Sequence, residues 1–259
     1  MKHPPLVQYL LHLADNALIL GHRNSEWTGH GPILEQDIAL SNIALDLIGQ
    51  ARNFYQYAAK LLNQQGETVT EDMLAYLRDG SEYKNHLLVE QPNGDWGNTI
   101  LRQFFYSSYQ YFLYQELKES KDENISAIAE KSLKEIIYHL RWSSEWVIRL
   151  GDGTEESHKR MKNALHDLVK YTGELFTSSA YENALITDRI TIDPSVLKLK
   201  WEEKVNAVLL EAGLLDEFSL TSQNIEMQTG GKEGNHSEHL GAILTEMQFL
   251  QRAYPDCEW

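Results

Sequence analysis

The chain has 259 residues, of which 42% are hydrophobic and 24% are charged, and its formal net charge is −15 at pH 7. The apolar fraction is sufficient for a substantial core, but the negative charge argues against binding to nucleic acid or to an anionic membrane surface. No apolar run approaches the roughly 20 residues that cross a bilayer, so no membrane partner is expected.

The first residues, MKHPPLVQYLLHLADN, are apolar but are interrupted by His12, Asp15 and Asn16. They also lack a small-residue cleavage site, so a signal peptide is not expected. Cys257 is the only cysteine, which argues against an intramolecular disulfide and a thiolate metal cluster. We therefore expect a soluble, cytoplasmic protein.

Hydrophobic periodicity predicts helices along nearly the whole chain. A first helix over residues 5–23 stops at a stretch that contains glycine and proline, and a second covers residues 33–64. Apolar residues of the second helix recur at three-to-four-residue and seven-residue steps, as on a helix that faces a core: Leu34, Ile38, Leu45, Ile48 and Phe54. A short helix near residues 71–78 is followed by a loop that Pro92 and Gly94 enforce.

A third long helix, over residues 99–120, is dense in aromatic residues, and a fourth covers residues 124–150. Further helices are predicted over residues 155–177, 194–212 and 236–253. Thr154 is expected to cap the first of these three. No strand-like alternation stands out, and long helices joined by short loops favour a bundle. We predict an all-α helical bundle with additional helices, in a single domain over residues 1–259.

A helical bundle of this size suggests one chemistry to test, a di-iron centre. Ferritin-like di-metal proteins take one Glu from each of two helices and a Glu-x-x-His pair from each of the other two. Carboxylates bridge and neutralise two hard cations, and imidazole completes the coordination. The i, i+3 spacing places both ligands on one face of a helix.

The sequence departs from this pattern in both helices that should carry Glu-x-x-His. In LDLIGQAR, Asp46 offers a carboxylate, but a glycine stands where the histidine belongs and Gln50 follows it. In KEIIYHLRW, Glu135 is followed at i+3 by Tyr138, and His139 falls one residue late. Two carboxylates and one displaced histidine are too few for two irons. We predict no metal and no cofactor in this chain.

The same residues are predicted to form a vestigial metal-site cluster, a buried polar group that fills the former cavity with hydrogen bonds: Asp46, Gln50, Glu135, Tyr138 and His139. Arg52 or Arg141 is the expected counter-ion. A residual single-metal site and plain surface positions are the alternatives for these residues.

A glycine-rich segment, TGGKEGNHSEHLG, precedes the last predicted helix. Such a loop at a helix start offers free N–H groups that can hold a phosphate or another anion. The candidates for contact with an anion or a partner are Gly230, Gly231, Lys232, His236 and His239. Asn235 or Ser237 is expected to cap the helix. Two other interpretations are a helix-start loop whose histidines are satisfied locally or at an interface, and a metal site.

The aromatic residues of the third long helix indicate a core or a contact surface, since tyrosine is enriched where one end of the ring meets water or a partner. Tyr106 and Tyr109, with Trp142 from the fourth helix, are the predicted interface candidates.

Four segments together resemble one family. They are SEWTGHGPILEQDIALSNIALDLIGQARN over residues 25–53, LLVEQPNGD over residues 87–95, KEIIYHLRWS over residues 134–143 and TGGKEGNHSEHLGAILTEMQFLQR over residues 229–252. The similarity extends from about residue 7 to the last residue and is to the C-type subunits of bacterial phenylacetyl-CoA epoxidase, a multicomponent ring 1,2-monooxygenase.

The resemblance implies a ferritin-like bundle that serves as a structural, non-catalytic subunit in phenylacetate catabolism and supports a catalytic A subunit. That partner would carry the di-iron centre and epoxidise the ring of phenylacetyl-CoA with O2. A separate flavin and iron–sulfur reductase subunit would supply electrons from NADPH and would meet this chain only indirectly. The chain is then expected in a hetero-oligomer or a homo-oligomer.

Two further interpretations remain open. The chain would be an oxygenase or oxidase in its own right if Asp46, Glu135 and His139 built an atypical metal site. It would be an accessory module if residues 230–236 bound CoA. Metal analysis tests the first, and CoA binding by the isolated chain tests the second.

Overall fold

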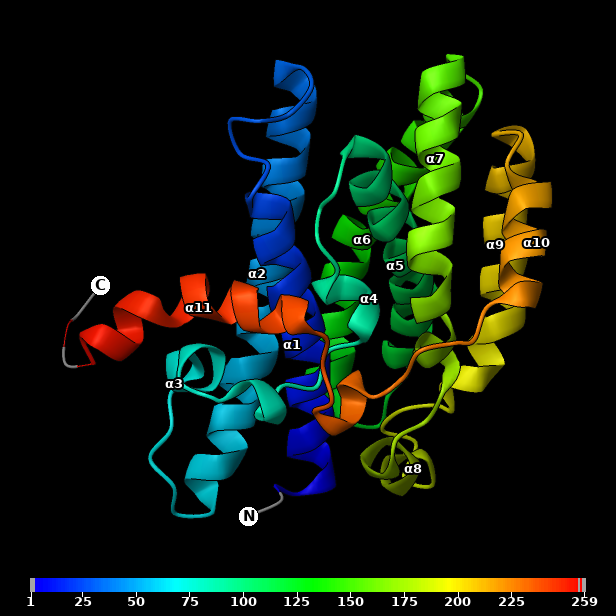
Figure 1. Ribbon diagram of the computed structural model, residues 1–259. Coiled ribbons are helices and arrows are strands. Elements are labelled where there is room, and N and C mark those ends of the chain that lie inside the picture. The colour runs from blue at the N-terminus through cyan, green and yellow to red at the C-terminus, as the bar shows by residue number, and fades with distance from the viewer. Residues whose placement is uncertain (1–2, 256, 258–259) are drawn as a thin grey trace. The chain divides into compact units, whose positions relative to one another are not determined.

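The computed structural model describes residues 3–255 and residue 257, with residues 220 and 224 described by their backbone alone. Within these residues every regular element is helical, with eleven α-helices, five short 3-10 turns and no strand. Figure 1 shows the α-helices in chain order, from α1 near the N-terminus to α11 near the C-terminus. The all-α, ferritin-like fold class predicted from the sequence is confirmed. In this described part of the chain, none of the helices is both long and apolar enough to pass through a membrane.

The long helices lie where the sequence predicts them, with ends shifted by a few residues. They are α1 (Pro5–Ser25), α2 (Leu34–Gln64), α5 (Trp96–Leu117), α6 (Glu123–Gly151), α7 (Glu155–Leu168), α9 (Lys198–Glu211) and α11 (Glu238–Ala253), together with the short α3 (Glu71–Tyr76). The helix predicted over residues 155–177 ends earlier, at Leu168, and the chain continues in 3-10 turns. These turns are η2 (Val169–Tyr171) and η3 (Gly173–Phe176), and the others are η1 (Gly80–Glu82), η4 (Pro194–Leu197) and η5 (Gly231–Glu233).

The sequence pattern does not predict three short helices, α4 (Leu87–Glu90), α8 (Ala180–Ile186) and α10 (Leu215–Asn224). Helices of four to ten residues contain too few turns for a clear 3.6-residue pattern.

Short polar side chains cap several of the described helices, α5, α6 and α7 among them. Asp95, Asp122 and Thr154 accept hydrogen bonds from backbone N–H groups in the first turns of α5, α6 and α7, respectively. The cap predicted at Thr154 is therefore confirmed. Each such cap satisfies a backbone donor that the helix itself cannot pair and is worth about 1 kcal/mol.

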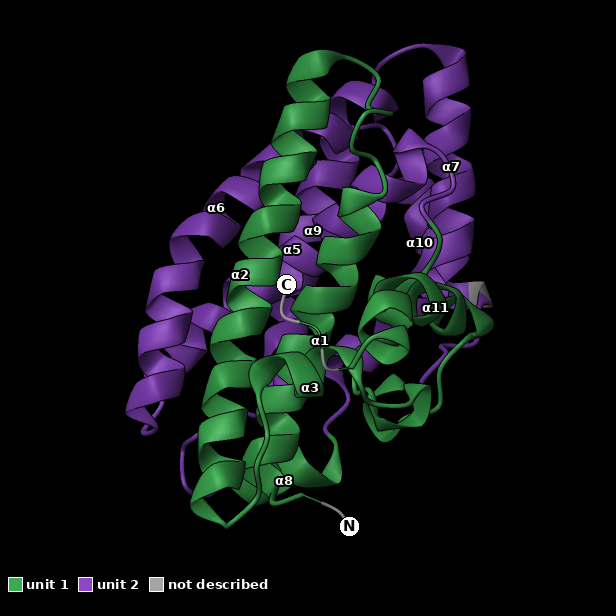
Figure 2. Ribbon diagram, turned by 90° about the vertical axis from the view of Figure 1, so that its left-hand side faces the viewer, with its two compact units in different colours: residues 1–92, 179–185, 230–259 green, residues 93–178, 186–229 purple. Residues whose placement is uncertain are grey.

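Contacts between residues divide the chain into two compact units, coloured separately in Figure 2. Unit 1 contains residues 1–92, 179–185 and 230–259, and unit 2 contains residues 93–178 and 186–229, as far as these are described. The chain therefore leaves unit 1 after its first third and returns to it twice. The single domain predicted over the whole chain stays a prediction.

Unit 1 is built on α1 and α2, which pack along each other. Their backbones approach closely, since a Cβ atom on Gly21 of α1 would lie 3.3 Å from the carbonyl oxygen of Ala44 of α2. Helix α1 is buried at nearly every position from Val7 to Gly21. Helix α11 packs against α1, α3 and α4, and it runs across the direction of α1 in Figure 1.

The buried face of α2 differs from the predicted one. Leu34, Ile38 and Leu45 are 72%, 52% and 66% exposed, so their assignment to the core is wrong, whereas Phe54 is fully buried as predicted. The helix buries a neighbouring face that is rich in alanine: Ala39, Leu40, Ile43, Ala44, Leu47, Ala51, Ala58 and Ala59. Alanine is a weak hydrophobic signal, so a pattern based on the larger side chains selected the wrong face.

In unit 2, α5 packs against α6 and α7, and an aromatic core lies on the side of α9. Trp201 of α9 donates its indole N–H to the carbonyl oxygen of Phe105 at 2.9 Å. Its ring lies 5.5 Å from the ring of Phe105 and 5.3 Å from that of Phe176, measured between centroids.

The three interface candidates are buried within unit 2. Tyr106, Tyr109 and Trp142 are 3%, 1% and 7% exposed. Tyr109 stacks edge-on against Phe176, and Trp142 against Trp96, each with ring centroids 6.0 Å apart. The rings are covered by their own chain, because large aromatic side chains gain most from complete burial. At most 7% of any of these three residues is exposed in this structure, and their place at an interface stays a prediction.

Candidate functional site

The predicted vestigial cluster draws on one helix from each unit, and the two halves are described separately. In unit 1, α2 buries the side chain of Gln50 and leaves Asp46 half-buried. Gly49, where the di-iron pattern requires histidine, is exposed, and outside its own helix no described atom lies within 4 Å of the place of a Cβ. Arg52 lies 3.6 Å from Glu71, so this predicted counter-ion pairs with another carboxylate.

In unit 2, α6 buries His139 fully, leaves Glu135 half-buried and exposes 37% of Tyr138. Glu135 and His139 are four residues apart and share one face of the helix, whereas Tyr138 points further toward solvent. Arg141 lies 4.0 Å from Glu145. Among the described residues, no three His, Cys, Asp or Glu side chains are grouped closely enough to hold a metal ion. The vestigial cluster and its metal-binding alternative stay predictions.

The glycine-rich segment, residues 230–239, lies in unit 1, where a buried ion pair holds it. Lys232 Nζ lies 2.9 Å and 3.1 Å from the two carboxylate oxygens of Glu182, and both side chains are almost fully buried. Burial alone would raise the pKa of Glu182, but the charge of Lys232 and the hydrogen bonds from Lys232 and the Ser179 backbone act together with other contacts to lower it. The cation of this segment therefore has an anionic partner within the chain.

A second buried carboxylate, Glu90 of α4, holds the end of the segment. One of its oxygens accepts hydrogen bonds from the backbone N–H and the hydroxyl of Ser237, both at 2.7 Å. Its other oxygen lies 2.8 Å from Nδ1 of His236, whose Nε2 lies 3.0 Å from the carbonyl oxygen of Tyr83. Burial alone would lower the pKa of His236, but the hydrogen bond and the charge of Glu90 raise it.

Ser237 is the N-cap residue of α11, as the sequence allows, but its side chain makes no capping hydrogen bond because the hydroxyl donates to Glu90. His239, two residues later, is half-buried. Its carbonyl oxygen accepts a hydrogen bond from Arg23 at 3.4 Å, and the same guanidinium donates to the carbonyl oxygen of Glu90 at 2.9 Å and 3.2 Å.

The backbone of unit 1 requires glycine at several positions of this segment. A Cβ atom on Gly231 would collide with the carbonyl oxygen of Asn85, and one on Gly234 with that of Ser81. Gly230 and Gly234 also have positive φ angles, 137° and 85°, which favour glycine. Close backbone approach therefore accounts for glycine at these positions, and contact with an anion or a partner stays a prediction.

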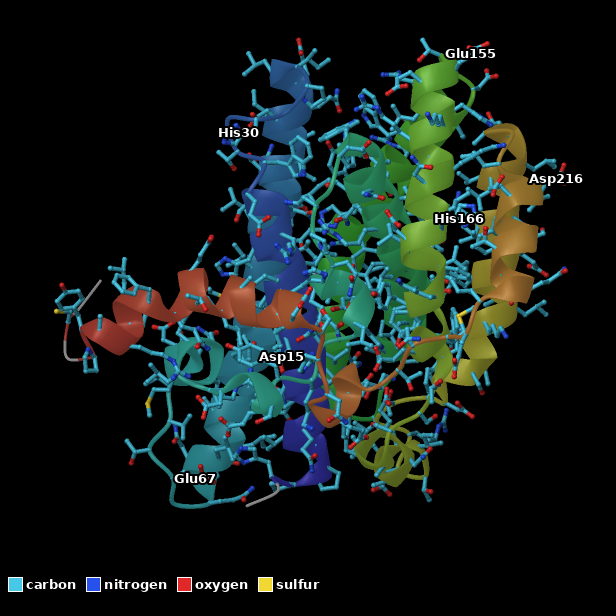
Figure 3. The ribbon with its side chains drawn as sticks, in the orientation of Figure 1. Asp15, His30, Glu67, Glu155, His166 and Asp216 are labelled. Atoms are coloured by element: carbon cyan, nitrogen blue, oxygen red, sulfur yellow. The ribbon has the colours of Figure 1, made fainter. Side chains whose placement is uncertain are left out.

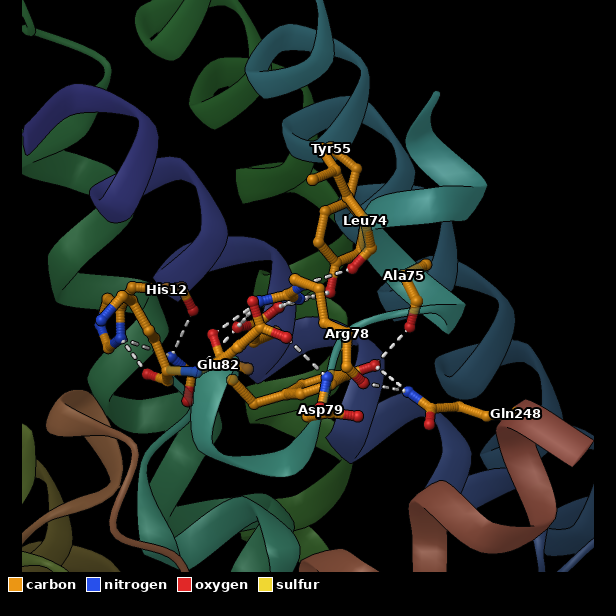
Figure 4. A network of polar contacts seen from close by, with 12 residues as sticks. His12, Tyr55, Leu74, Ala75, Arg78, Asp79, Glu82 and Gln248 are labelled. Atoms are coloured by element: carbon orange, nitrogen blue, oxygen red, sulfur yellow. Dashed lines mark hydrogen bonds and ion pairs between the residues drawn. The ribbon is translucent and has the colours of Figure 1, made fainter. Parts of the chain in front are cut away.

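Sequence reasoning missed a polar network that centres on Asp15, in the middle of α1 (Figure 3). The Asp15 carboxylate accepts hydrogen bonds from the guanidinium of Arg78 through both oxygens. It also accepts from the hydroxyl of Tyr55 at 2.5 Å and from the backbone N–H of Lys84 at 2.8 Å. Figure 4 shows this network, in which Arg78 also donates to the carbonyl oxygen of Leu74.

The network continues to α11. Gln248 donates to the carbonyl oxygen of Arg78 at 2.9 Å and to the hydroxyl of Tyr83 at 3.0 Å, and the Arg78 guanidinium lies 4.3 Å from the Tyr83 ring centroid. Burial raises the pKa of Tyr55 and that of Tyr83. Burial alone would lower the pKa of Arg78, but Asp15 raises it. The network therefore joins α1, α2 and α11 through one charged pair.

Two buried histidines lie beside the network. His12 Nδ1 is 2.7 Å from the carbonyl oxygen of Lys84, and His86 Nδ1 is 2.9 Å from Oδ1 of Asn16. The two ring centroids are 4.7 Å apart. Burial lowers the pKa of His12 to about 4 and that of His86 well below its ordinary value. Both rings are therefore neutral at pH 7.

The sequence does carry a signal for this network. His12, Asp15 and Asn16 interrupt an otherwise apolar helix, and all three are buried. Buried polar groups must be paired, so such interruptions predict partners from other segments.

These contacts hold the segments of unit 1 rigidly in place. Asp15 with Arg78, Glu182 with Lys232, and Glu90 with His236 each join segments that are far apart in the sequence. Buried pairs that are fully hydrogen-bonded fix geometry, because breaking them leaves a charge without solvent or partner.

Comparison with known proteins identifies the family of the chain. The family model described as phenylacetic acid catabolic protein matches residues 1–259. The C-type subunit of the 1,2-phenylacetyl-CoA epoxidase of Escherichia coli (strain K12) is 46% identical over 254 residues, which cover 98% of this chain and 99% of that relative. The resemblance carried by the four sequence segments is thereby confirmed, and the chain belongs to the phenylacetic acid catabolic protein family.

Proposed function

We propose that this chain is a structural, non-catalytic subunit of a multicomponent phenylacetyl-CoA 1,2-epoxidase and supports a catalytic A subunit that carries the di-iron centre. The observation that carries the proposal is the similarity to a C-type epoxidase subunit, at 46% identity over 98% of this chain and 99% of the relative. In the proposed cytoplasmic complex, the reductase that supplies electrons from NADPH meets this chain only indirectly.

The two positions that would hold histidine in a di-iron bundle support this role. Gly49 has no side chain to offer, and Tyr138 places its ring partly in solvent. Each iron of such a centre relies on an imidazole from a Glu-x-x-His pair. A scaffold needs no iron ligands, so residues other than histidine can occupy these two positions.

The buried ion pairs of unit 1 also suit a scaffold. A supporting subunit must present a fixed surface, and cross-links between distant segments keep that surface in one conformation. The CoA-binding alternative has less support, because Lys232 pairs with Glu182 and the nearby glycines are required by backbone approach.

Reconstitution of the epoxidase tests the proposal. The A subunit and the reductase are assayed for phenylacetyl-CoA epoxidation with and without this chain, and metal per chain is measured on this chain purified alone. We expect activity to rise when this chain is added, and metal near zero in this chain. About two metal ions per chain, together with turnover in the absence of the A subunit, would overturn the proposal.

A paired variant sharpens this test. Asp46→Asn combined with Glu135→Gln removes both carboxylates of the predicted cluster while keeping side-chain size. At saturating concentrations of the variant chain, a scaffold with these changes still supports epoxidation at the wild-type rate. Loss of turnover with the assembled complex intact would assign chemistry to these residues and contradict the proposal.

A further inference from the structure

The first half of α2 carries an exposed aliphatic stripe in unit 1. We call Leu34, Ile38 and Leu45 the α2 stripe; their side chains are 72%, 52% and 66% exposed, and Ile33 just before the helix is 53% exposed. Steps of four and seven residues place the three side chains on one side of the helix. With Gly49 one turn further on, this side is about 22 Å long at 1.5 Å per residue.

The α2 stripe has no role in holding unit 1 together. Helix α2 packs on α1 through its alanine-rich face, and the stripe lies outside that buried set. Single apolar side chains are common on protein surfaces, but several in a row along one helix mark a site of contact with another molecule.

Gly49 gives a second, independent indication. Its φ angle is not among the positive ones, and outside its own helix no described atom lies within 4 Å of the place of a Cβ atom. Glycine inside a helix is unfavourable compared with alanine, and within this chain nothing that the structure describes requires it here. A close approach by another backbone at this point would require it.

The charges around the stripe indicate which occupant fits. Next to stripe residues in the sequence lie the carboxylates Glu35, Asp37 and Asp46, and residues 24–51 contain no lysine or arginine. The arginines that border this stretch are paired with other carboxylates, Arg23 with Glu26 at 2.9 Å and Arg52 with Glu71 at 3.6 Å. A second copy of this chain, with a net charge of −15, would bring like charges together at the contact, which is unfavourable. A different chain with basic residues beside an aliphatic surface is complementary.

We propose that the α2 stripe docks a helix of the catalytic A subunit, and that the docked helix is aliphatic or small at its centre and carries lysine or arginine at its rim. The inference rests on the proposed function and adds the surface and the chemistry of its partner. Stable interfaces bury roughly 800 Å² on each side, with most of the binding energy near the centre. A helix-on-helix contact along the stripe would supply that centre.

The test uses full-length variants and the A subunit, with the dissociation constant as readout. Leu45→Glu places a charge in the stripe, and Leu210→Glu places the same charge on α9, where Leu210 is 67% exposed and thus matches Leu45. We expect Leu45→Glu to weaken binding at least about tenfold and Leu210→Glu to bind like the wild type. Both sites are exposed, so circular dichroism should show unchanged helix content.

Gly49→Leu tests the close approach without adding charge. Gly49 is exposed and a Cβ atom there has no described neighbour outside its own helix within 4 Å, so we expect the variant to fold, which circular dichroism checks. The longer side chain would hold the partner helix away and weaken binding. If Leu45→Glu and Gly49→Leu both bind as tightly as Leu210→Glu, the stripe is not the docking surface. If the wild type itself does not bind the A subunit, the proposed function is overturned together with this inference.

Sedimentation of the isolated chain tests whether a second copy of the chain, instead of the A subunit, covers the α2 stripe. We expect the wild type and Leu45→Glu to sediment alike. A wild-type dimer that becomes monomeric in Leu45→Glu would show that a second copy covers the stripe, which would overturn the assignment to the A subunit.

Discussion

Lys232 and Glu182 form a pair whose loss should be costly. Replacing Lys232 by methionine keeps the length of the side chain but leaves the Glu182 carboxylate buried without a cation. Breaking a buried pair in this way costs about 3–5 kcal/mol. We expect the free energy of unfolding, measured by urea denaturation at pH 7, to fall by that amount.

Two comparisons show whether the unpaired charge is the cause. Lys232→Met combined with Glu182→Leu removes both charges and should recover much of the lost stability, since an apolar pair of similar volume can replace an ion pair. Arg160→Ala breaks the solvent-accessible pairs with Glu156 and Asp95 and should leave the midpoint nearly unchanged. Equal midpoints for Lys232→Met and the wild type would mean that the pair contributes nothing to stability.

His12 makes the stability of unit 1 depend on pH. Histidine in the unfolded chain binds its proton near pH 6.5, whereas the folded His12 does so only near pH 4. Between these values the unfolded chain binds more protons, so the free energy of unfolding falls as pH decreases, by about 1.4 kcal/mol per pH unit. His22 and His86, whose pKa values are also lowered by burial, act in the same direction.

His236 opposes this trend. Its pKa is raised in the folded chain, so its contribution is complete below pH 6.5 and is lost as pH rises through the folded pKa. Because three histidines act in one direction and one in the other, urea denaturation at pH 7 and pH 5 should give the lower free energy of unfolding at pH 5. His12→Gln should flatten this dependence, and an unchanged slope in that variant would remove His12 as the cause.

Sequence reasoning at single positions succeeded where local chemistry decides the outcome. Thr154 caps α7 because a hydroxyl before a helix has a nearby backbone donor to accept from. It did not identify the partners of Lys232 or Asp15, since Glu182 and Arg78 lie 50 and 63 residues away. Such pairings depend on the tertiary fold, which one sequence does not specify by spacing.

Glycines in two elements should respond in opposite ways to alanine. Gly49→Ala in α2 meets no atom of a neighbouring element and should raise the free energy of unfolding by about 0.5–1 kcal/mol, because alanine restricts the unfolded chain and suits a helix. Gly231→Ala in η5 should lower it, since its Cβ would collide with the carbonyl oxygen of Asn85. Thermal and urea unfolding of the two variants check this; destabilisation by Gly49→Ala would show that α2 needs glycine for its own fold.

The existence of the long helices followed from periodicity, but the orientation of α2 did not. Its apolar residues are spread around the helix, and the face that packs on α1 is chosen by the small size of its alanines. The tyrosines of α5 show the opposite difference, because they are buried where a contact surface is predicted. Tyr106 and Tyr109 have polar ends that suit a surface, yet burial of their rings placed them inside.

The net charge of the whole chain influences the rate at which it associates with a partner. At −15, association with a basic surface should be accelerated by attraction at long range, and added salt should screen it. We expect the association rate with the A subunit to fall by about tenfold or more from low to high salt, with a smaller change in the dissociation rate. Stopped-flow measurements over a salt series check this, and a rate independent of salt would argue for an uncharged partner surface.

The division of unit 1 into three stretches of chain has a consequence for synthesis. Its first stretch ends at Pro92, while Glu182 and Lys232, which form one of its buried pairs, are translated much later. At about 5–20 residues per second, the ribosome needs on the order of ten seconds to supply the missing parts. Unit 1 is therefore completed only after its third stretch has been translated, and a chain that stops before Lys232 lacks one of the contacts that close it. The order of the segments thus delays the assembly of unit 1 until all three stretches have been made.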